Sequence, residues 1–205
     1  MQKIQVKKIY LNGEILAFCA DFALSKNFNP RMLDEVDKSK VKLHPNLLNS
    51  SRFLASRVLK FYALNEFLSQ NLKDKAKSVY FCLSHSKNVV ALALAPFKIG
   101  FDIETIKQRN VNACLDFCFN DSEKARVFAR SGENLDEFYR IFTAKEALLK
   151  LNDLQFSDFD KVGYDENGVW FDLKTFKSQN VTLKYHKFNL CGQTFLSCCA
   201  FENTF

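Results

Sequence analysis

Proline and glycine are scarce in this sequence, since its 205 residues contain three prolines and six glycines. That scarcity excludes collagen-like and low-complexity chains and argues against a long flexible linker. The longest apolar runs, such as residues 89–95, fall far short of the roughly 20 residues that a membrane-spanning helix needs. Residues 1–14 contain no apolar core of signal-peptide length. We therefore expect a cytoplasmic protein with no membrane partner.

Histidine is equally rare, and none of the seven cysteines forms a CxxC pair. Clustered cysteines and histidines are the usual zinc ligands, so we expect no zinc site. Cys114 and Cys118 are one helical turn apart, and Cys198 and Cys199 are adjacent. Because no spacing looks like a ligand set, we interpret the thiols as buried and reduced, as in a cytoplasmic protein.

The sequence is rich in apolar and aromatic residues, with 47% hydrophobic residues and 22 phenylalanines. That content fills a sizeable core and excludes a disordered chain. The charge is uneven: residues 1–97 hold 15 basic and 7 acidic side chains, net +8, whereas residues 98–205 hold 14 and 16, net −2. A basic half beside a mildly acidic half fits an anionic ligand on one side and a cation site on the other.

Hydrophobic periodicity and turn residues predict an α+β fold with small antiparallel sheets packed on helices. An order of strand, helices and strands occurs twice, with a join near residues 96–98, and predicts two halves at 1–97 and 98–205. The predicted helical segments are 13–28, 49–68, 111–119, 122–130 and 135–151. The predicted strands are 4–11, 79–84, 89–95, 99–103, 161–164, 169–173, 181–188 and 194–201, with a turn at 166–168.

Two acidic segments carry candidate metal ligands. Alternation along a strand places Asp102 and Glu104 on the same side, about 7 Å apart at Cα, within reach of one small cation. On the helix 135–151, Phe142, Glu146 and Lys150 share one face. The alternatives are a solvated acidic face on an edge strand and a surface Glu146–Lys150 ion pair.

Two segments of the first half carry candidate phosphate ligands. His85 lies between two serines at the end of a strand, where it and Ser84 could bind a phosphate or simply close a turn. Arg52 and Arg57 lie on the predicted helix 49–68, and a basic helix face binds phosphate. A solvated face is the alternative for Arg52, whereas Arg57 lies among apolar positions.

The order of these segments resembles a known family. Three motifs carry the resemblance: SHS at 84–86, GFDIE at 100–104 after 13 residues, and FTAKEALLK at 142–150 after about 40 more. Their order and spacing are similar to those of the 4′-phosphopantetheinyl transferases. The closer match is to the two-domain type that includes the surfactin-synthetase and enterobactin activators. The resemblance covers residues 50–151 directly. It implies a monomer of two similar halves related by an internal pseudo-twofold.

The resemblance implies a holo-acyl-carrier-protein synthase reaction. The phosphopantetheine arm of coenzyme A moves to a serine of an acidic apo acyl carrier protein or peptidyl carrier domain, and 3′,5′-ADP leaves. Asp102, Glu104 and Glu146 would hold Mg²⁺, or Mn²⁺ in its place. Glu146 would act as the base toward the serine hydroxyl. Lys145 and Lys150 would hold phosphate charge.

The resemblance also implies a coenzyme A site in the first half. His85 and Ser84 would contact the 3′-phosphate region, and Arg52 and Arg57 the nucleotide phosphates. The sequence departs from the family pattern in two places. Phe101 replaces the usual isoleucine or valine but is still apolar. A Gly-Lys-Pro segment before SHS is absent, and Lys75 or Lys77 is the candidate to replace its lysine.

Other function classes stay open at this point. A metal-dependent phosphodiesterase or nuclease also uses acidic metal triads, but it would need no coenzyme A. A basic nucleic-acid-binding protein is disfavoured, because the helix 49–68 is more apolar than a groove-reading helix and the net charge of +6 is modest. A catalytically silent relative that only binds carrier proteins is disfavoured because all three carboxylates are intact.

Overall fold

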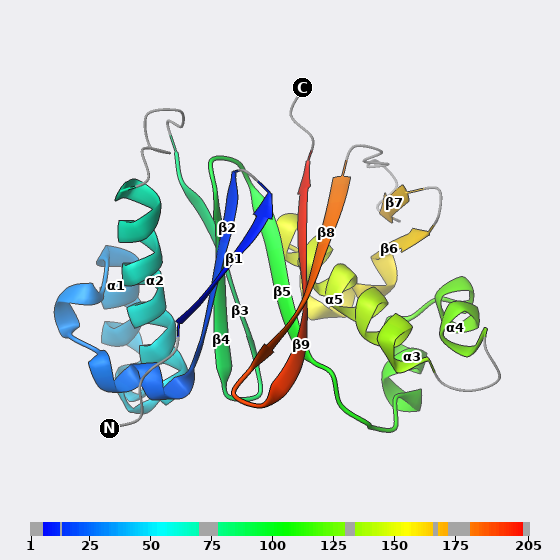
Figure 1. Ribbon diagram of the computed structural model, residues 1–205, viewed down its shortest axis with the longest axis horizontal. Helices are drawn as coiled ribbons and strands as arrows, with labels where there is room; N and C mark the ends of the chain where they lie inside the picture. The colour runs from blue at the N-terminus through cyan, green and yellow to red at the C-terminus, as the bar shows by residue number, and fades with distance from the viewer. Residues whose placement is uncertain are drawn as a thin grey trace. The chain divides into compact units, whose positions relative to one another are not determined.

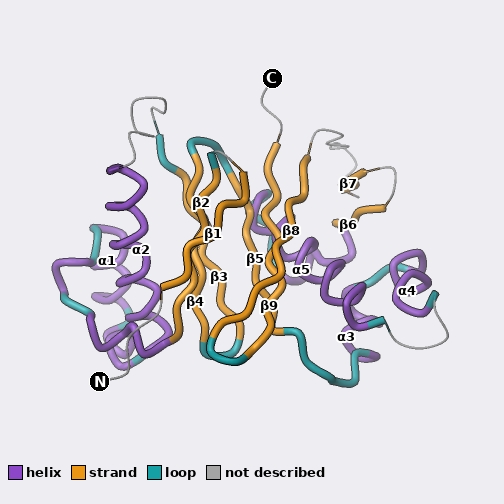
Figure 2. The backbone as a smooth tube through the Cα atoms, viewed as in Figure 1, coloured by secondary structure: helices purple, strands orange, loops and turns teal. Residues whose placement is uncertain are grey.

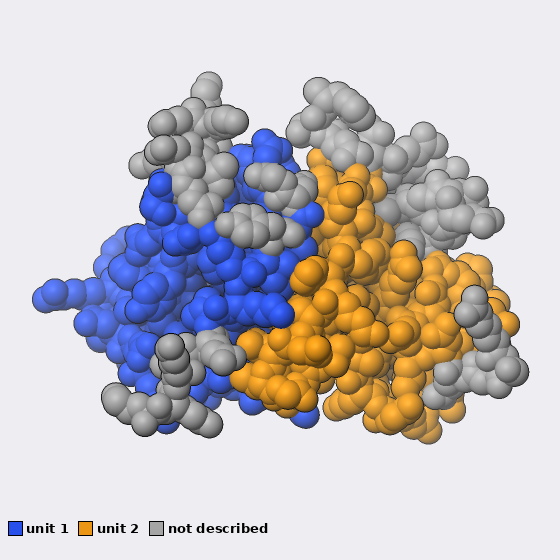
Figure 3. All heavy atoms as spheres, in the orientation of Figure 1, with its two compact units in different colours: residues 1–97 blue, residues 98–205 orange. Residues whose placement is uncertain are grey.

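The structure is a computed structural model of the chain, and it describes residues 6–12, 14–69, 78–129, 134–165, 168–171 and 181–202. The chain divides into two compact units, residues 1–97 and 98–205 (Figure 3). Each unit contains its own antiparallel sheet, with helices packed against it. The predicted α+β class is therefore confirmed. The internal pseudo-twofold stays a prediction.

The first unit contains a four-stranded antiparallel sheet in the order β1-β2-β4-β3 (Figure 1). Its strands are β1 (Val6–Asn12), β2 (Ile15–Asp21), β3 (Tyr80–Ser86) and β4 (Val89–Ala95). Its helices are α1 (Glu35–Leu43) and α2 (Ser51–Ser69), with the short 3₁₀ turns η1 (Phe22–Asn27), η2 (Pro30–Met32) and η3 (Pro45–Asn49). Ser50 Oγ accepts a hydrogen bond from the Phe53 amide at 3.3 Å, and this contact fixes the start of α2.

The predicted helix at 13–28 is wrong. Residues 15–21 form β2, and η1 follows it. Leu16, Phe18 and Ala20 of β2 pack in one core with α2. Their neighbours on the opposite face of the strand are buried as well. A strand that is apolar on both faces gives a continuous apolar run, and periodicity alone does not distinguish such a run from a buried helix.

The second unit contains a three-stranded antiparallel sheet in the order β5-β9-β8 and a separate two-stranded hairpin, β6-β7. Its strands are β5 (Ile99–Thr105), β6 (Val162–Asp165), β7 (Gly168–Phe171), β8 (Val181–Leu190) and β9 (Gln193–Glu202). Its helices are α3 (Asn112–Cys118), α4 (Asp121–Phe128) and α5 (Leu135–Leu151), followed by the 3₁₀ turn η5 (Phe156–Lys161). Among the described residues, the predicted strands and helices of this half are confirmed within two residues at their ends, whereas residue 130 and residues 172–173 of two predicted elements lie outside the described residues. Part of the predicted turn, residues 166–167, lies outside the described residues.

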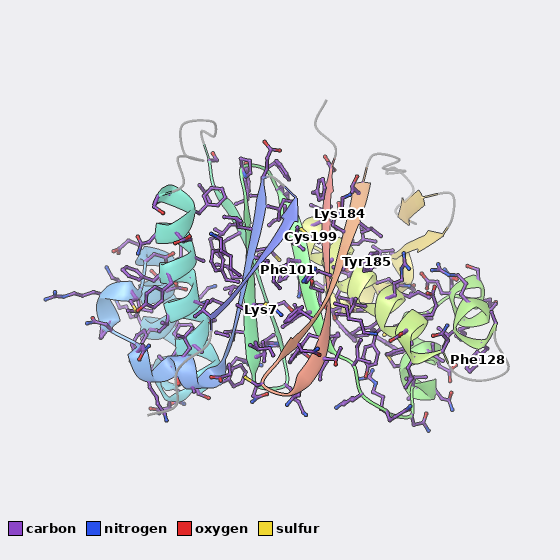
Figure 4. All side chains as sticks on the ribbon, in the orientation of Figure 1. Lys7, Phe101, Phe128, Lys184, Tyr185 and Cys199 are labelled. Carbon is purple, nitrogen blue, oxygen red and sulfur yellow. The ribbon has the colours of Figure 1, made fainter. Side chains whose placement is uncertain are left out.

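Helix α5 packs across β5 and β9 (Figure 2). The register pairs Phe101 of β5 with Cys199 of β9, both labelled in Figure 4. Gly100 lets the helix approach this closely, because a Cβ at residue 100 would lie 1.8 Å from the Ala147 carbonyl oxygen. Backbone contact of this kind requires glycine. It sets the backbone of β5 directly beside the last two turns of α5.

The cysteines correct another expectation. All seven lie among the described residues and none is disulfide-bonded, but only four are buried. Cys191 is exposed, and Cys82 and Cys114 are partly exposed. Within the described part of the chain, no helix is long and apolar enough to cross a membrane.

Candidate active site

Three of the predicted site residues come together between β5 and α5. Lys150 Nζ donates to Asp102 Oδ1 at 2.7 Å and to the Phe101 carbonyl at 3.2 Å. The same nitrogen lies 4.0 Å from Glu146 Oε2. Lys150 therefore bonds mainly to the strand carboxylate rather than to its neighbour one turn earlier in the helix. The Glu146–Lys150 ion pair is therefore present but long, and it is not a simple surface pair because Lys150 also bonds to the buried Asp102.

Burial gives this cluster its electrostatics. Asp102 is only 3% exposed, whereas the Glu146 and Lys150 side chains are 21% and 28% exposed. Burial raises the pKa of Glu146 to about 7, and the nearby Asp102 charge adds to the increase, while Lys150 opposes it. A solvated acidic strand face is therefore excluded for Asp102. Glu146 is a carboxyl group poised to exchange a proton near neutral pH.

Glu104 is half-buried and lies on β5 two residues beyond Asp102. Burial raises the pKa of Tyr139, and the Glu104 charge contributes to that shift. Tyr139 and Glu146 are seven residues apart on α5, two turns along one face. Among the described residues, no three His, Cys, Asp or Glu side chains are gathered closely enough to hold a metal ion. The metal set of Asp102, Glu104 and Glu146 stays a prediction.

The chemistry of the donors nevertheless fits a divalent cation. Carboxylate oxygens are the hard ligands that Mg²⁺ prefers. Lys150 Nζ lies 2.7 Å from Asp102 Oδ1 and 4.0 Å from Glu146 Oε2, so the two carboxylates flank one cation and their negative charges repel. A cation between them would relieve this repulsion, as the Lys150 ammonium does in part. The residues therefore suit the ion that the family resemblance implies.

Lys145 does not join this cluster. It is 0% exposed and its Nζ donates to Glu123 Oε2 of α4 at 2.8 Å. The rings of Phe119 and Phe159 lie 5.8 and 5.9 Å from the ammonium. In this arrangement the charge does not reach solvent, so the structure does not favour the predicted role in phosphate binding.

In the first unit, Arg52 and His85 lie side by side. Arg52 Nη1 of α2 is 2.9 Å from His85 Nε2 of β3, and both side chains are exposed. Ser84, the preceding residue of β3, is buried. Two segments 33 residues apart thus bring an arginine and a histidine to one surface, which is the chemistry that recognises a phosphate.

Arg57 points elsewhere. Its Nε lies 2.8 Å from Asp37 Oδ1 of α1, and both side chains are buried. Lys60 joins the same cluster, with its Nζ 3.0 Å from Asp37 Oδ2 and 2.5 Å from Asp34 Oδ2. The cluster ties α1 to α2, so the structure does not favour a phosphate role for Arg57. Lys75 and Lys77 lie outside the described residues.

Two residues important for the site were given no role from the sequence, although Gly100 belongs to the GFDIE motif. Gly100 permits the contact between β5 and α5, and Glu123 holds Lys145 in the core. Glu123 also completes a capping box at the start of α4, where Asn120 Oδ1 accepts from the Glu123 amide and Glu123 Oε2 accepts from the Asn120 amide. The Asn-x-x-Glu spacing is a recognisable sequence signal for that cap, although not for the partner of Lys145.

The arrangement of two carboxylates and an ammonium beside a tight strand–helix contact agrees with the comparison with known families. The family model of the 4′-phosphopantetheinyl transferase superfamily matches residues 98–203, just over half of the chain and nearly all of the second unit. The chain belongs to this superfamily, whose members transfer phosphopantetheine from coenzyme A to carrier proteins. No curated protein matches the chain.

Proposed function

We propose that the chain is a two-domain transferase of the surfactin-synthetase-activator type. It moves the 4′-phosphopantetheine arm of coenzyme A to a serine of an apo acyl or peptidyl carrier protein and releases 3′,5′-ADP. The observation that carries this proposal is the meeting of Asp102, Glu146 and Lys150 within the part of the chain that the family model matches. An acidic carrier, a monomeric state and a cytoplasmic location belong to the same proposal.

The protein's own side chains have distinct roles in this reaction. Glu146, with a pKa near neutrality, accepts the proton of the carrier serine as its oxygen attacks the β-phosphorus. Lys150, already between two carboxylates, offers its ammonium to the phosphate oxygens on which charge accumulates. Asp102 keeps Lys150 in position through the 2.7 Å contact.

Asp102, Glu104 and Glu146 would hold Mg²⁺, or Mn²⁺ in its place. When bound, the ion supplies positive charge beside the pyrophosphate that is cleaved. In the first unit, Arg52, His85 and Ser84 would bind the 3′-phosphate region of coenzyme A. Arg57 and Lys145 would reach a phosphate only after leaving their buried ion pairs, so we assign them structural roles.

The direct test is to incubate the full chain with coenzyme A, Mg²⁺ and an apo carrier protein and to weigh the carrier. Addition of the phosphopantetheine mass supports the transferase. An unmodified carrier, with cleavage of a nucleic acid or phosphodiester substrate instead, overturns it in favour of a nuclease. A carrier that binds the chain but gains no mass overturns it in favour of a silent relative.

The first-unit assignment has its own test. Arg52→Gln and His85→Gln should each raise KM for coenzyme A by about tenfold or more, since each removes a phosphate partner. With 3′-dephospho-coenzyme A, the same variants should behave like the unmodified protein, because the phosphate they would bind is missing. An equal loss with both donors would contradict contact with the 3′-phosphate.

A further inference from the structure

Helix α3 carries a close pair of thiols that the proposed transfer reaction does not use. Cys114 and Cys118 are four residues apart, and their sulfur atoms are 3.8 Å from each other. Cys114 is partly exposed to solvent, whereas Cys118 is buried beneath it in the core. A small oxidant can therefore reach one sulfur directly, while the second lies next to it on the inner side.

We propose that Cys114 and Cys118 form a peroxide-sensitive site, at which Cys114 reacts with the oxidant and Cys118 then closes an intrahelical disulfide. The proposal does not rest on the proposed function, although the charge of Glu146 acts on both thiols. It goes beyond the interpretation of these thiols as buried and reduced.

The surroundings of Cys114 favour reactivity. Arg109 lies close to the thiol and is itself positioned over the rings of Phe138 and Tyr139, at 5.1 and 5.7 Å from their centres. The hydrogen bond shared with Cys118 and the nearby Arg109 together lower the pKa of Cys114 to about 7, although partial burial and the Glu146 charge oppose the shift. A thiol that is substantially ionised at neutral pH and partly exposed is the kind that oxidants attack.

Two buried cysteines lack this combination. Burial raises the pKa of Cys19 to about 12 and raises that of Cys198 as well, so neither forms a thiolate readily. Cys191 is exposed in the turn between β8 and β9. Because Cys191 is accessible, it provides the natural comparison for a test of selectivity.

The local geometry allows a disulfide to close. Residues four apart on a helix have Cβ atoms about 5–6 Å apart, slightly more than the roughly 3.5–4.5 Å that a disulfide requires. Cys118 is the last residue of α3, and Phe119 after it is already extended. Helix ends fray most easily, so a small change in the last turn can bring the sulfurs from 3.8 Å to bonding distance.

The chemistry balances with hydrogen peroxide as the oxidant. The Cys114 thiolate attacks one peroxide oxygen, the O–O bond breaks, and Cys114 becomes a sulfenic acid as hydroxide leaves. Cys118 sulfur then attacks Cys114 sulfur, the S–O bond breaks, and water leaves after the Cys118 proton is transferred. Two thiols and one peroxide thus give one disulfide and two waters, and a dithiol reductant reverses the change.

The test uses the full chain, treated with hydrogen peroxide near pH 7 and then unfolded in a thiol-alkylating reagent. Cys114 and Cys118 lie between Arg109 and Lys124, so trypsin leaves both in one peptide. We expect that peptide to lose two hydrogens and both alkyl groups, and to regain them after treatment with dithiothreitol. In untreated protein, Cys114 should react with a limiting alkylating reagent at least about tenfold faster than Cys191.

Variants separate the two roles. In Cys118→Ser, and in Cys118→Ala as a second variant in case the first folds poorly, peroxide should leave a sulfenic acid on Cys114 that a dimedone probe traps. Cys191→Ser is the control and should still form the disulfide. The proposal is overturned if both thiols of the treated peptide remain open to alkylation, or if Cys114 reacts no faster than Cys191.

Discussion

Two lysines of one helix, five residues apart, have opposite environments. Lys145 of α5 is fully buried and bonds to Glu123, which is 1% exposed. Lys150 is 28% exposed and bonds to Asp102 beside Glu146. The first pair closes the core of the second unit, whereas the second leaves one side of its cation open to water. The two lysines, which flank Glu146 in the sequence, therefore have different roles.

This difference indicates that Lys145 contributes to stability, whereas Lys150 is available for the reaction. A buried ion pair requires both partners, because removing one leaves an uncompensated charge in the protein interior. A partly exposed cation can exchange one anionic partner for another at smaller cost. We infer that Lys145 holds α4 against α5 and that Lys150 is the lysine available to a phosphate.

The largest effect on stability should come from breaking the buried Lys145–Glu123 pair. Lys145→Met leaves Glu123 charged and buried, so the free energy of unfolding should fall by about 3–5 kcal/mol. Lys150→Met also leaves a buried carboxylate, that of Asp102, but it should cost less, about 1–3 kcal/mol, because the Lys150 ammonium is itself 28% exposed. Denaturant titration measures both. The double variant Glu123→Gln with Lys145→Met should recover most of the loss, and equal losses for the two single lysine variants would contradict the contrast.

A second change should disturb the cluster of Asp102, Glu146 and Lys150 without altering the buried Lys145–Glu123 pair. In Gly100→Ala, the new Cβ would lie 1.8 Å from the Ala147 carbonyl oxygen, so α5 must move away from β5. We expect a loss of about 1–3 kcal/mol in unfolding free energy and a loss of transfer activity. Denaturant titration and the carrier-mass assay check these results. Normal stability and activity would show that the close contact is not needed.

A third change concerns Glu146 alone. Its folded pKa of about 7 lies above the ordinary 4.5, so the folded state retains the proton as pH rises, and stability decreases between about pH 4.5 and pH 7. The Glu146→Gln variant should not show this decrease in stability as pH rises. Without metal, it should be more stable than the unmodified protein by about 1–3 kcal/mol above pH 7 and nearly equal near pH 4. Thermal unfolding across this range measures the difference, and a constant difference at all pH values would contradict the pKa shift.

The smallest effect should come from metal addition. If Asp102 takes part in holding a divalent cation, Mg²⁺ at ten times its dissociation constant should stabilise the chain by about 1.4 kcal/mol. Asp102→Asn should lose this stabilisation. Asp153→Asn, an exposed aspartate paired with Lys98 after α5, is the matched control and should keep it. An equal thermal shift in all three proteins would place the ion elsewhere.

Spacing along the chain made Asp102, Glu146 and Lys150 candidates, and the family resemblance implied that they act in one site. Strand alternation and helical periodicity identify faces, and the strands and helices of the second half have regular patterns. The same reasoning did not separate Lys145 from Lys150, because the partner of Lys145 lies 22 residues earlier on another helix. Which lysine is buried depends on tertiary packing and not on local pattern.

Other failures have similar causes. The strand β2 was mistaken for a helix because both of its faces are buried. Arg57, whose phosphate role stays a prediction, was a candidate because it lies on a basic helix, and its buried partner Asp37 lies on α1, a helix that was not among the predicted ones. Long-range charge pairs leave little trace in a single sequence, whereas the repeat of a strand or helix does.

We propose that Asp102, Glu146 and Lys150 form the catalytic centre and that the buried Lys145–Glu123 pair has no catalytic role. The most direct test is the rate at which carrier protein gains phosphopantetheine mass with Glu146→Gln, compared with the unmodified chain and Asp153→Asn. Removing a general base typically costs about 10²–10⁴-fold in rate. We predict a loss of that size for folded Glu146→Gln and no loss for Asp153→Asn. A Glu146→Gln rate within a few-fold of the unmodified chain would contradict the account.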